Sequence, residues 1–245
     1  MAAKTKTKSP PAPRRFERPN LLTSLVFVLP LLVFYEIGVL SSNRLNGADL
    51  ITTTLLRLVG MRVFIWIQIG LIAAVVGIAV YLRRKQRFSI GHILPVLLES
   101  GIYALTMGTL IIFVMVDILG IDPRLAATGA LKSASVFEKL VTSVGAGVHE
   151  ELVFRLLMLG GLFGLLQRLK LIERSWLALI VALLISSALF SAAHHIGSLG
   201  DPLKVGVFTY RLIAGMIFGL LYHYRSFAIA VYTHTLYDIY VLLIG

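Results

Sequence analysis

Runs of about 20 apolar residues, separated by short polar stretches, recur along most of the chain. A helix needs about 20 such residues to cross a bilayer. The pattern therefore predicts seven membrane-spanning helices, at Leu21–Leu40, Val63–Leu82, Ile93–Val116, Leu152–Leu169, Trp176–Ala193, Val205–Tyr222 and Phe227–Ile244.

Two shorter segments also show helical apolar spacing. Asp49–Val59 is too short to span, which favours an interfacial or re-entrant helix. Val136–Val148 predicts a short helix leading into the fourth span. The expected fold is an all-α, polytopic membrane protein with about seven or eight transmembrane helices.

The composition agrees with this fold class. Hydrophobic residues make up 58% of the 245 residues and charged residues only 14%, whereas soluble domains average about 45–50% and about 25%. An ordinary soluble globule is excluded, and so is a disordered chain. The absence of cysteine excludes disulfides, a thiolate zinc site and a cysteine nucleophile.

Basic residues lie in short clusters between the apolar runs and give a net charge of +11. Residues 1–19 hold six of them among prolines, which predicts a disordered basic tail that contacts anionic lipid head groups. Further clusters at residues 83–87, 168–174 and Arg225 fall on alternate connections. Positive loops face the cytoplasm, so the N-terminus is expected there and the C-terminus outside. No nucleic-acid motif is present, and no nucleic-acid partner is expected.

Ionisable residues inside spans cost about 2.5–3.5 kcal/mol each on insertion scales and are therefore informative. They concentrate in the last hundred residues, where His149, Glu150, Glu151 and Arg155 open the fourth predicted span, His194 and His195 close the fifth, and His234 and Asp238 lie in the seventh. Glu99 stands apart in the third, with His92 seven residues before it.

The fourth predicted span carries a glutamate pair. Glu151 and Arg155 are four residues apart, so they share a helix face and can form a structural ion pair. Glu150 points about a quarter-turn away and has no obvious partner on its helix. It is either an interfacial carboxylate or a general base that takes a proton from water.

Two further pairs have the same spacing. Phe190 and His194 share one face, as do His234 and Asp238, where the carboxylate can hold one ring nitrogen and fix the tautomer presented by the other. A polar staple between helices is the alternative for the second pair. Together, one glutamate and two histidines from three spans predict a convergent polar site.

Small residues and one arginine complete the polar pattern. Gly160 with Gly164, and Gly215 with Gly219, form GxxxG steps that allow close helix approach. Arg211 has no partner nearby in sequence. It either extends to the outer interface or binds a substrate carboxylate.

Three motifs occur in order on successive predicted helices: Glu-Glu-x-x-x-Arg at residues 150–155, Phe-x-x-x-His at 190–194, and His-x-x-x-Asp at 234–238. In this order and membrane context they resemble the CPBP intramembrane proteases, also called the Abi or type II CAAX prenyl endopeptidase family. The resemblance covers roughly residues 136–245, which would form the catalytic helical core. Residues 20–135 are the N-terminal transmembrane helices and match nothing specific.

The resemblance implies an endopeptidase with its site in a cavity within the bilayer. It implies that Glu150 and His194 activate the attacking water, that Glu151 and Arg155 support them, and that the last motif stabilises the oxyanion. This chain has Asp238 where the family usually has asparagine, and an ionised aspartate cannot donate a hydrogen bond. His234 is therefore assigned the donor role, with Asp238 either orienting it or protonated.

Glu150, His194, His234 and Asp238 would also make a plausible zinc site. The helix lacks the second histidine of the HExxH motif, so a metal-free mechanism is favoured, no cofactor is expected, and zinc stays an alternative. His195 is a spare ligand or a residue at the cavity mouth.

Two other functions are compatible with these residues. One is a transporter or proton relay through Glu99, Glu150 and Asp238, although the two halves show no inverted repeat. The other is a non-catalytic immunity or binding scaffold. The protease hypothesis predicts a multi-pass protein of a bacterial-type inner membrane, acting on a peptide or protein substrate within the bilayer from its outer half.

Overall fold

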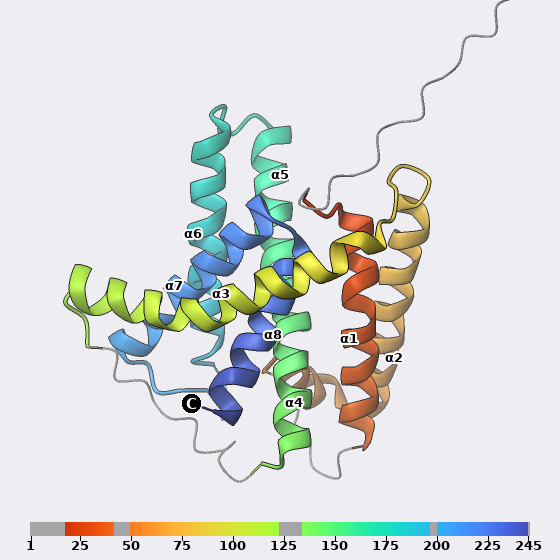
Figure 1. Ribbon diagram of the computed structural model, residues 1–245, viewed down its shortest axis with the longest axis horizontal. Coiled ribbons are helices and arrows are strands. Elements are labelled where there is room, and N and C mark those ends of the chain that lie inside the picture. The colour runs from red at the N-terminus through yellow and green to blue at the C-terminus, as the bar shows by residue number, and fades with distance from the viewer. Residues whose placement is uncertain (1–17, 42–49, 123–133, 197–199, 245) are drawn as a thin grey trace, which may run out of the picture.

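Seven continuous helical segments make up the regular structure of the computed structural model, which describes residues 18–41, 50–122, 134–196 and 200–244. The predicted basic tail lies almost entirely outside these residues. In chain order the segments are α1 (Leu21–Ser41), α2 (Leu50–Leu82), η2–α3–η3 (Ile90–His92, Ile93–Phe113, Val114–Ile118), α4–η5–α5 (Val136–Gly145, Ala146–Leu159, Gly160–Arg168), α6 (Ser175–Ala193), α7 (Val205–Tyr224) and α8 (Phe227–Leu243) (Figure 1).

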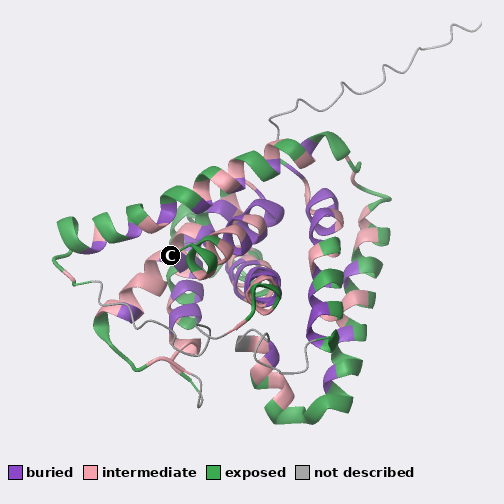
Figure 2. Ribbon diagram, turned by 60° about the horizontal axis from the view of Figure 1, so that its bottom comes forward, coloured by how far each residue is buried: buried purple, intermediate pink, exposed green. Residues whose placement is uncertain are grey.

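The lengths of the helices and their exposed apolar side chains confirm the helical membrane fold. Five helices (α1, the part of α2 from Ile51, η2–α3–η3, α6 and α7) are long and apolar enough to span a bilayer, and α8 is a shorter apolar helix. Large apolar side chains also face outward, such as Trp66 at 72% exposed, Leu98 at 61% and Leu105 at 63%. The outer faces of α2 and α3 are largely exposed (Figure 2). Lipid tails, rather than water, suit such faces.

A bend at Gly60 divides α2 into a short first part and a long second part. Gly60 has φ 76°, in the left-handed region that favours glycine. The residues before it correspond to the short helix predicted at Asp49–Val59, of which Asp49 lies outside the described residues. Its interfacial location stays a prediction.

The fourth segment is longer than the sequence predicted. One helical run extends from Val136 to Arg168, so the Glu-Glu pair lies in its middle and does not open a span. The run starts at a capping box in which the Ser135 Oγ accepts from the Glu138 N–H at 3.2 Å and the Glu138 carboxylate accepts from the Ser135 N–H at 2.8 Å. The expected boundary was wrong because polar residues lower hydropathy without interrupting the backbone hydrogen bonds.

Helix α8 lies at the centre of the bundle and packs against α1, α3, α4, η5 and α7. Glycines bring neighbouring helices close to one another. A Cβ on Gly219 would clash with the Leu183 side chain, and one on Gly215 would lie 3.1 Å from Ser187. Helix α7 therefore approaches α6 as the GxxxG spacing predicts. Gly160 meets the Tyr222 hydroxyl, whereas Gly164 has nothing within 4 Å, so the first predicted step is only half correct.

The basic connections lie at one end of the bundle, drawn uppermost in Figure 1. The start of α1 contacts the α2–α3 connection through Asn20 Nδ2, which donates to the Arg87 carbonyl at 2.8 Å, and through the Leu22 N–H, which donates to Gln86 Oε1 at 2.9 Å. The α5–α6 and α7–α8 connections lie toward the same end (Figure 1). Alternate connections therefore share one end of the molecule, as the charge pattern requires.

Candidate functional site

The middle of the fourth helical segment, η5, carries the glutamate pair. Its hydrogen bonds are of the π type, as when the Gly160 N–H bonds to the Arg155 carbonyl five residues earlier. Glu150 and Glu151 are 2% and 0% exposed. A wider turn brings residues four and five apart onto one face, so Glu150 and Glu151 both reach the bundle interior on the side of Arg155. Such helices frequently mark functional sites.

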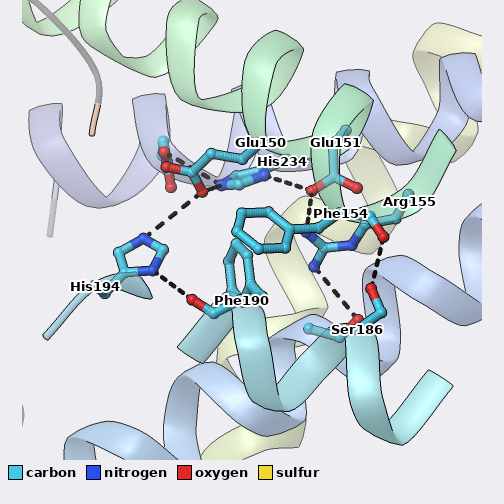
Figure 3. Close-up of polar contacts among 10 residues, drawn as sticks. Glu150, Glu151, Phe154, Arg155, Ser186, Phe190, His194 and His234 are labelled. Atoms are coloured by element: carbon cyan, nitrogen blue, oxygen red, sulfur yellow. Dashed lines mark hydrogen bonds and ion pairs between the residues drawn. The ribbon is translucent and has the colours of Figure 1, made fainter. Parts of the chain in front are cut away.

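Glu150 meets two histidines from other helices. Its Oε2 lies 3.6 Å from His194 Nε2, at the end of α6, and 3.9 Å from His234 Nε2, in α8 (Figure 3). The structure thus brings together one carboxylate and two imidazoles from separate segments of the chain.

The His194 ring is held from its other side. Its Nδ1 lies 2.9 Å from the Phe190 carbonyl oxygen, so Nδ1 carries the proton and Nε2 presents a lone pair toward Glu150. The Phe190 ring packs edge-on at 4.9 Å, as the shared helix face predicts. Burial lowers the pKa of His194 to about 3, and the positive charge of Arg211 acts in the same direction. His194 is therefore a neutral base at neutral pH.

The His234 ring has a different partner from the one expected. Its Nδ1 lies 2.7 Å from Glu151 Oε1, whereas Asp238 Oδ2 is 3.6 Å from Nε2. The prediction that Asp238 fixes one ring nitrogen is therefore wrong, and Glu151 does so. The reason is that Glu151 reaches α8 from the neighbouring helix, a contact that sequence spacing does not reveal. The ring also stacks on Phe218, with centroids 4.4 Å apart.

Arg155 is buried at 1% exposed and holds Glu151 from behind. Its Nη1 lies 3.1 Å from Glu151 Oε1, which confirms the predicted ion pair, and its Nη2 donates to the Gly215 carbonyl at 3.3 Å. The guanidinium lies over the Phe190 ring at 4.3 Å from the centroid. Arg155, Glu151 and His234 thus form a connected polar chain across three helices.

Sequence reasoning missed several residues that build this site. The Ser186 hydroxyl donates to the Phe154 carbonyl at 2.6 Å and ties α6 to η5 (Figure 3). A Cβ on Gly147 would lie 2.9 Å from the backbone nitrogen of Thr235, next to His234. Glycine at 147 therefore lets α8 approach η5. The sequence offers no local signal for these contacts, because each partner lies far away along the chain.

Other predicted polar residues lie outside the cluster. Glu99 accepts from Arg225 Nη2 at 2.8 Å and from the Tyr103 hydroxyl at 2.9 Å, at the basic end of the bundle. Arg211, for which no nearby partner in sequence was found, forms an ion pair with Asp201 at 2.6 Å. Glu99 therefore supports no relay with Glu150 or Asp238.

His149 and His195 have separate surroundings. His149 Nε2 lies 3.4 Å from Gln68 Nε2 and 3.9 Å from Glu36 Oε1, so it faces α1 and α2. His195 Nδ1 donates to the Asp201 carbonyl at 3.0 Å, in the connection after α6. Neither ring belongs to the Glu150 cluster. His92 precedes α3 and is buried at 6% exposed.

Within the described part of the chain, no group of three or more His, Asp or Glu side chains is arranged to hold a metal ion. His234 Nδ1 is already occupied by Glu151, and its Nε2 faces two carboxylates at 3.6 and 3.9 Å. The zinc site stays an alternative prediction.

Part of the chain matches a known protein family. Residues 132–240 match the family model described as type II CAAX prenyl endopeptidase Rce1-like. This region is similar to that family, which agrees with the resemblance of the three motifs to the CPBP proteases. Searches of the curated proteins and of the solved structures give no match.

The family match covers all three motifs, from the Glu-Glu pair in η5 to His234 and Asp238 in α8. Its lower bound, residue 132, lies just before α4. The match supports the resemblance to the CAAX-type proteases. Helices α1 to α3 lie outside the matched region and cover part of it. Helix α1 packs against α4 and α8, and α3 packs against α8.

Proposed function

We propose that this protein is an intramembrane endopeptidase in which Glu150 is the general base and His194 its partner. One observation carries the proposal: Glu150 Oε2 lies 3.6 Å from His194 Nε2 and 3.9 Å from His234 Nε2, in a buried position between helices. The CPBP match supports the protease class.

The attacking water is held by two acceptors. His194 Nε2 and Glu150 Oε2 face each other 3.6 Å apart, and His194 Nδ1 donates its proton in a hydrogen bond to the Phe190 carbonyl. A water can donate one hydrogen to each acceptor and direct an oxygen lone pair at the substrate carbonyl carbon. Glu150 takes the proton as the new C–O bond forms.

His234 stabilises the negative charge that develops on the substrate oxygen. Its Nδ1 proton is held by Glu151, and Asp238 and Glu150 lie within 4 Å of Nε2. A ring with protons on both nitrogens keeps the Nδ1–H bond to Glu151 and offers the Nε2–H to the oxyanion. When the tetrahedral intermediate breaks, the C–N bond cleaves and Glu150 passes its proton to the leaving amine.

The basic end of the bundle supports an orientation. If the N-terminus and the basic connections face the cytoplasm, His194 and the end of α6 lie toward the opposite face. The substrate peptide then reaches the site from the outer half of a bacterial-type inner membrane.

The experiment is cleavage of fluorogenic peptides and of candidate membrane-protein substrates by the purified protein in lipid. Wild type, Glu150→Gln and the control Glu99→Gln are compared, each with and without a chelator. Glu99→Gln makes the same carboxylate-to-amide change in a site bonded to Arg225, away from the cluster.

Loss of general-base catalysis lowers kcat by about 10²- to 10⁴-fold. We expect this loss in Glu150→Gln, near wild-type kcat in Glu99→Gln, and no effect of the chelator. Activity that the chelator abolishes and zinc restores would overturn the metal-free mechanism. Absence of cleavage of every peptide and membrane protein by the wild type would overturn the peptidase assignment itself.

A further inference from the structure

The connection after α6 follows His194 directly and folds back on it. The Asp201 N–H donates to the His194 carbonyl at 2.9 Å, and His195 Nδ1 donates to the Asp201 carbonyl at 3.0 Å. The Asp201 backbone therefore bonds to the His194 carbonyl and to the His195 ring.

Gly200 permits this approach. A Cβ at this position would lie 2.8 Å from the carbonyl carbon of His195 and 3.0 Å from the Ile196 nitrogen, both backbone atoms. A side chain at residue 200 would force Gly200 and Asp201 away from the His195–Ile196 peptide. The contact between Asp201 and the two histidines thus requires glycine at residue 200.

Helix α7 anchors the same connection. The Asp201 carboxylate pairs with Arg211 at 2.6 Å, and the two side chains are 13% and 22% exposed. The Ser191 hydroxyl donates to the Phe208 carbonyl at 2.7 Å, and the His195 ring stacks on Phe208 with centroids 6.0 Å apart. These contacts fix the end of α6 against the first turns of α7.

We propose that Asp201 and Arg211 are positioning residues that hold His194 at its distance from Glu150. The inference rests on the proposed function for its catalytic consequence. The Arg211 guanidinium pairs with the Asp201 carboxylate, and the Asp201 N–H donates to the His194 carbonyl. The His194 ring then faces Glu150 at 3.6 Å. Neither residue belongs to the three motifs.

The test is a double-mutant cycle of Asp201→Asn, Arg211→Gln and the double variant, with Arg211→Lys as the conservative change. A misplacement of about 1 Å costs about 10²-fold in rate. We expect each single variant to lower kcat about 10- to 100-fold with KM within about 3-fold, the double variant to lose no more than either single, and Arg211→Lys to recover part of the loss.

Glu99→Gln and Arg225→Gln are the matched controls, because they break another interhelical carboxylate–arginine pair. These controls are expected to lower thermal stability and to leave kcat unchanged. Two results would overturn the positioning role. One is a loss of kcat in the Asp201 and Arg211 variants that the controls share, and the other is a change of KM in these variants with kcat unchanged.

A measurement without turnover separates this inference from the proposed function. The chain has six histidines, so histidine-selective NMR gives six ring signals, of which His194→Asn identifies one. We expect Asp201→Asn and Arg211→Gln to shift the His194 and His195 signals and the controls to leave them in place. Unshifted signals refute the inference even if the peptidase is active. Shifted signals in a protein that cleaves nothing refute the peptidase and retain the positioning role.

Discussion

Gly147 sets the distance between the two helices that carry the glutamate pair and His234. A Cβ at Gly147 would clash with the Thr235 Oγ1, and would lie 2.9 and 3.1 Å from the Thr235 backbone nitrogen and Cα. The hydroxyl can rotate away, but the backbone cannot. Ordinary contact begins at 3.4 Å, so Gly147→Ala must displace α8 from η5 by about 0.5 Å or more.

That displacement has two measurable consequences. Overpacking of this kind costs about 1–3 kcal/mol of stability. His234 moves with Thr235, so its 2.7 Å bond to Glu151 lengthens to the limit of about 3.2 Å for an N–H···O hydrogen bond. We expect kcat to fall about 10- to 100-fold, since rate is this sensitive to shifts on the order of 1 Å.

The assay compares kcat in lipid and thermal unfolding in detergent for Gly147→Ala and Gly164→Ala. Gly164 lies on the same helical run and has nothing within 4 Å, so alanine there is expected to be neutral or to stabilise by up to about 1 kcal/mol. If Gly147→Ala unfolds at the same temperature as Gly164→Ala and keeps its kcat, the close approach of α8 does not control the site.

Three further predictions follow from buried or paired groups. Arg155→Met leaves Glu151 buried without its ion pair and should lower the free energy of unfolding by about 3–5 kcal/mol. Adding Glu151→Gln to the same chain should restore part of this stability, and no restoration would contradict the pairing. Folding lowers the pKa of His194 from 6.5 to about 3, so between these values the unfolded chain binds more protons and the stability of the fold rises with pH. In thermal unfolding between pH 7 and pH 5, the wild type should lose about 2 kcal/mol more stability than His194→Asn. Equal losses in the two proteins would contradict the lowered pKa. Glu99→Gln should cost about 1 kcal/mol, because it breaks the partly exposed pair with Arg225, and a fall in kcat would place Glu99 in the site after all.

Hydropathy and helical spacing sufficed for the fold class, because a bilayer demands long apolar helices whatever their packing. The same reasoning predicted the Glu151–Arg155 pair, whose members lie one turn apart on a single helix. It failed where the decisive contact joins distant residues. Glu151 bonds to His234 83 residues away, and no spacing rule selects that carboxylate over Asp238.

Glycine contacts illustrate the same limit. The GxxxG spacing finds Gly215 and Gly219, which do pack on α6, but also Gly164, which contacts nothing. It misses Gly147, which belongs to no such pair. A glycine's role depends on whether another helix passes over it, and only the tertiary arrangement decides this. The Asp201–Arg211 pair was missed for the same reason, since its two residues belong to different elements.

The carboxylate at position 238 can now be understood through the position of Glu151. If residue 238 had to donate a hydrogen bond to the oxyanion, an ionised aspartate there would be a poor substitute for asparagine. Glu151 holds His234 Nδ1 at 2.7 Å, and Arg155 holds Glu151. Orientation of the ring is thus independent of residue 238. In the proposed mechanism, Asp238 lies 3.6 Å from Nε2 and adds negative charge beside the proton that His234 donates to the oxyanion. Aspartate can supply this charge, whereas asparagine cannot.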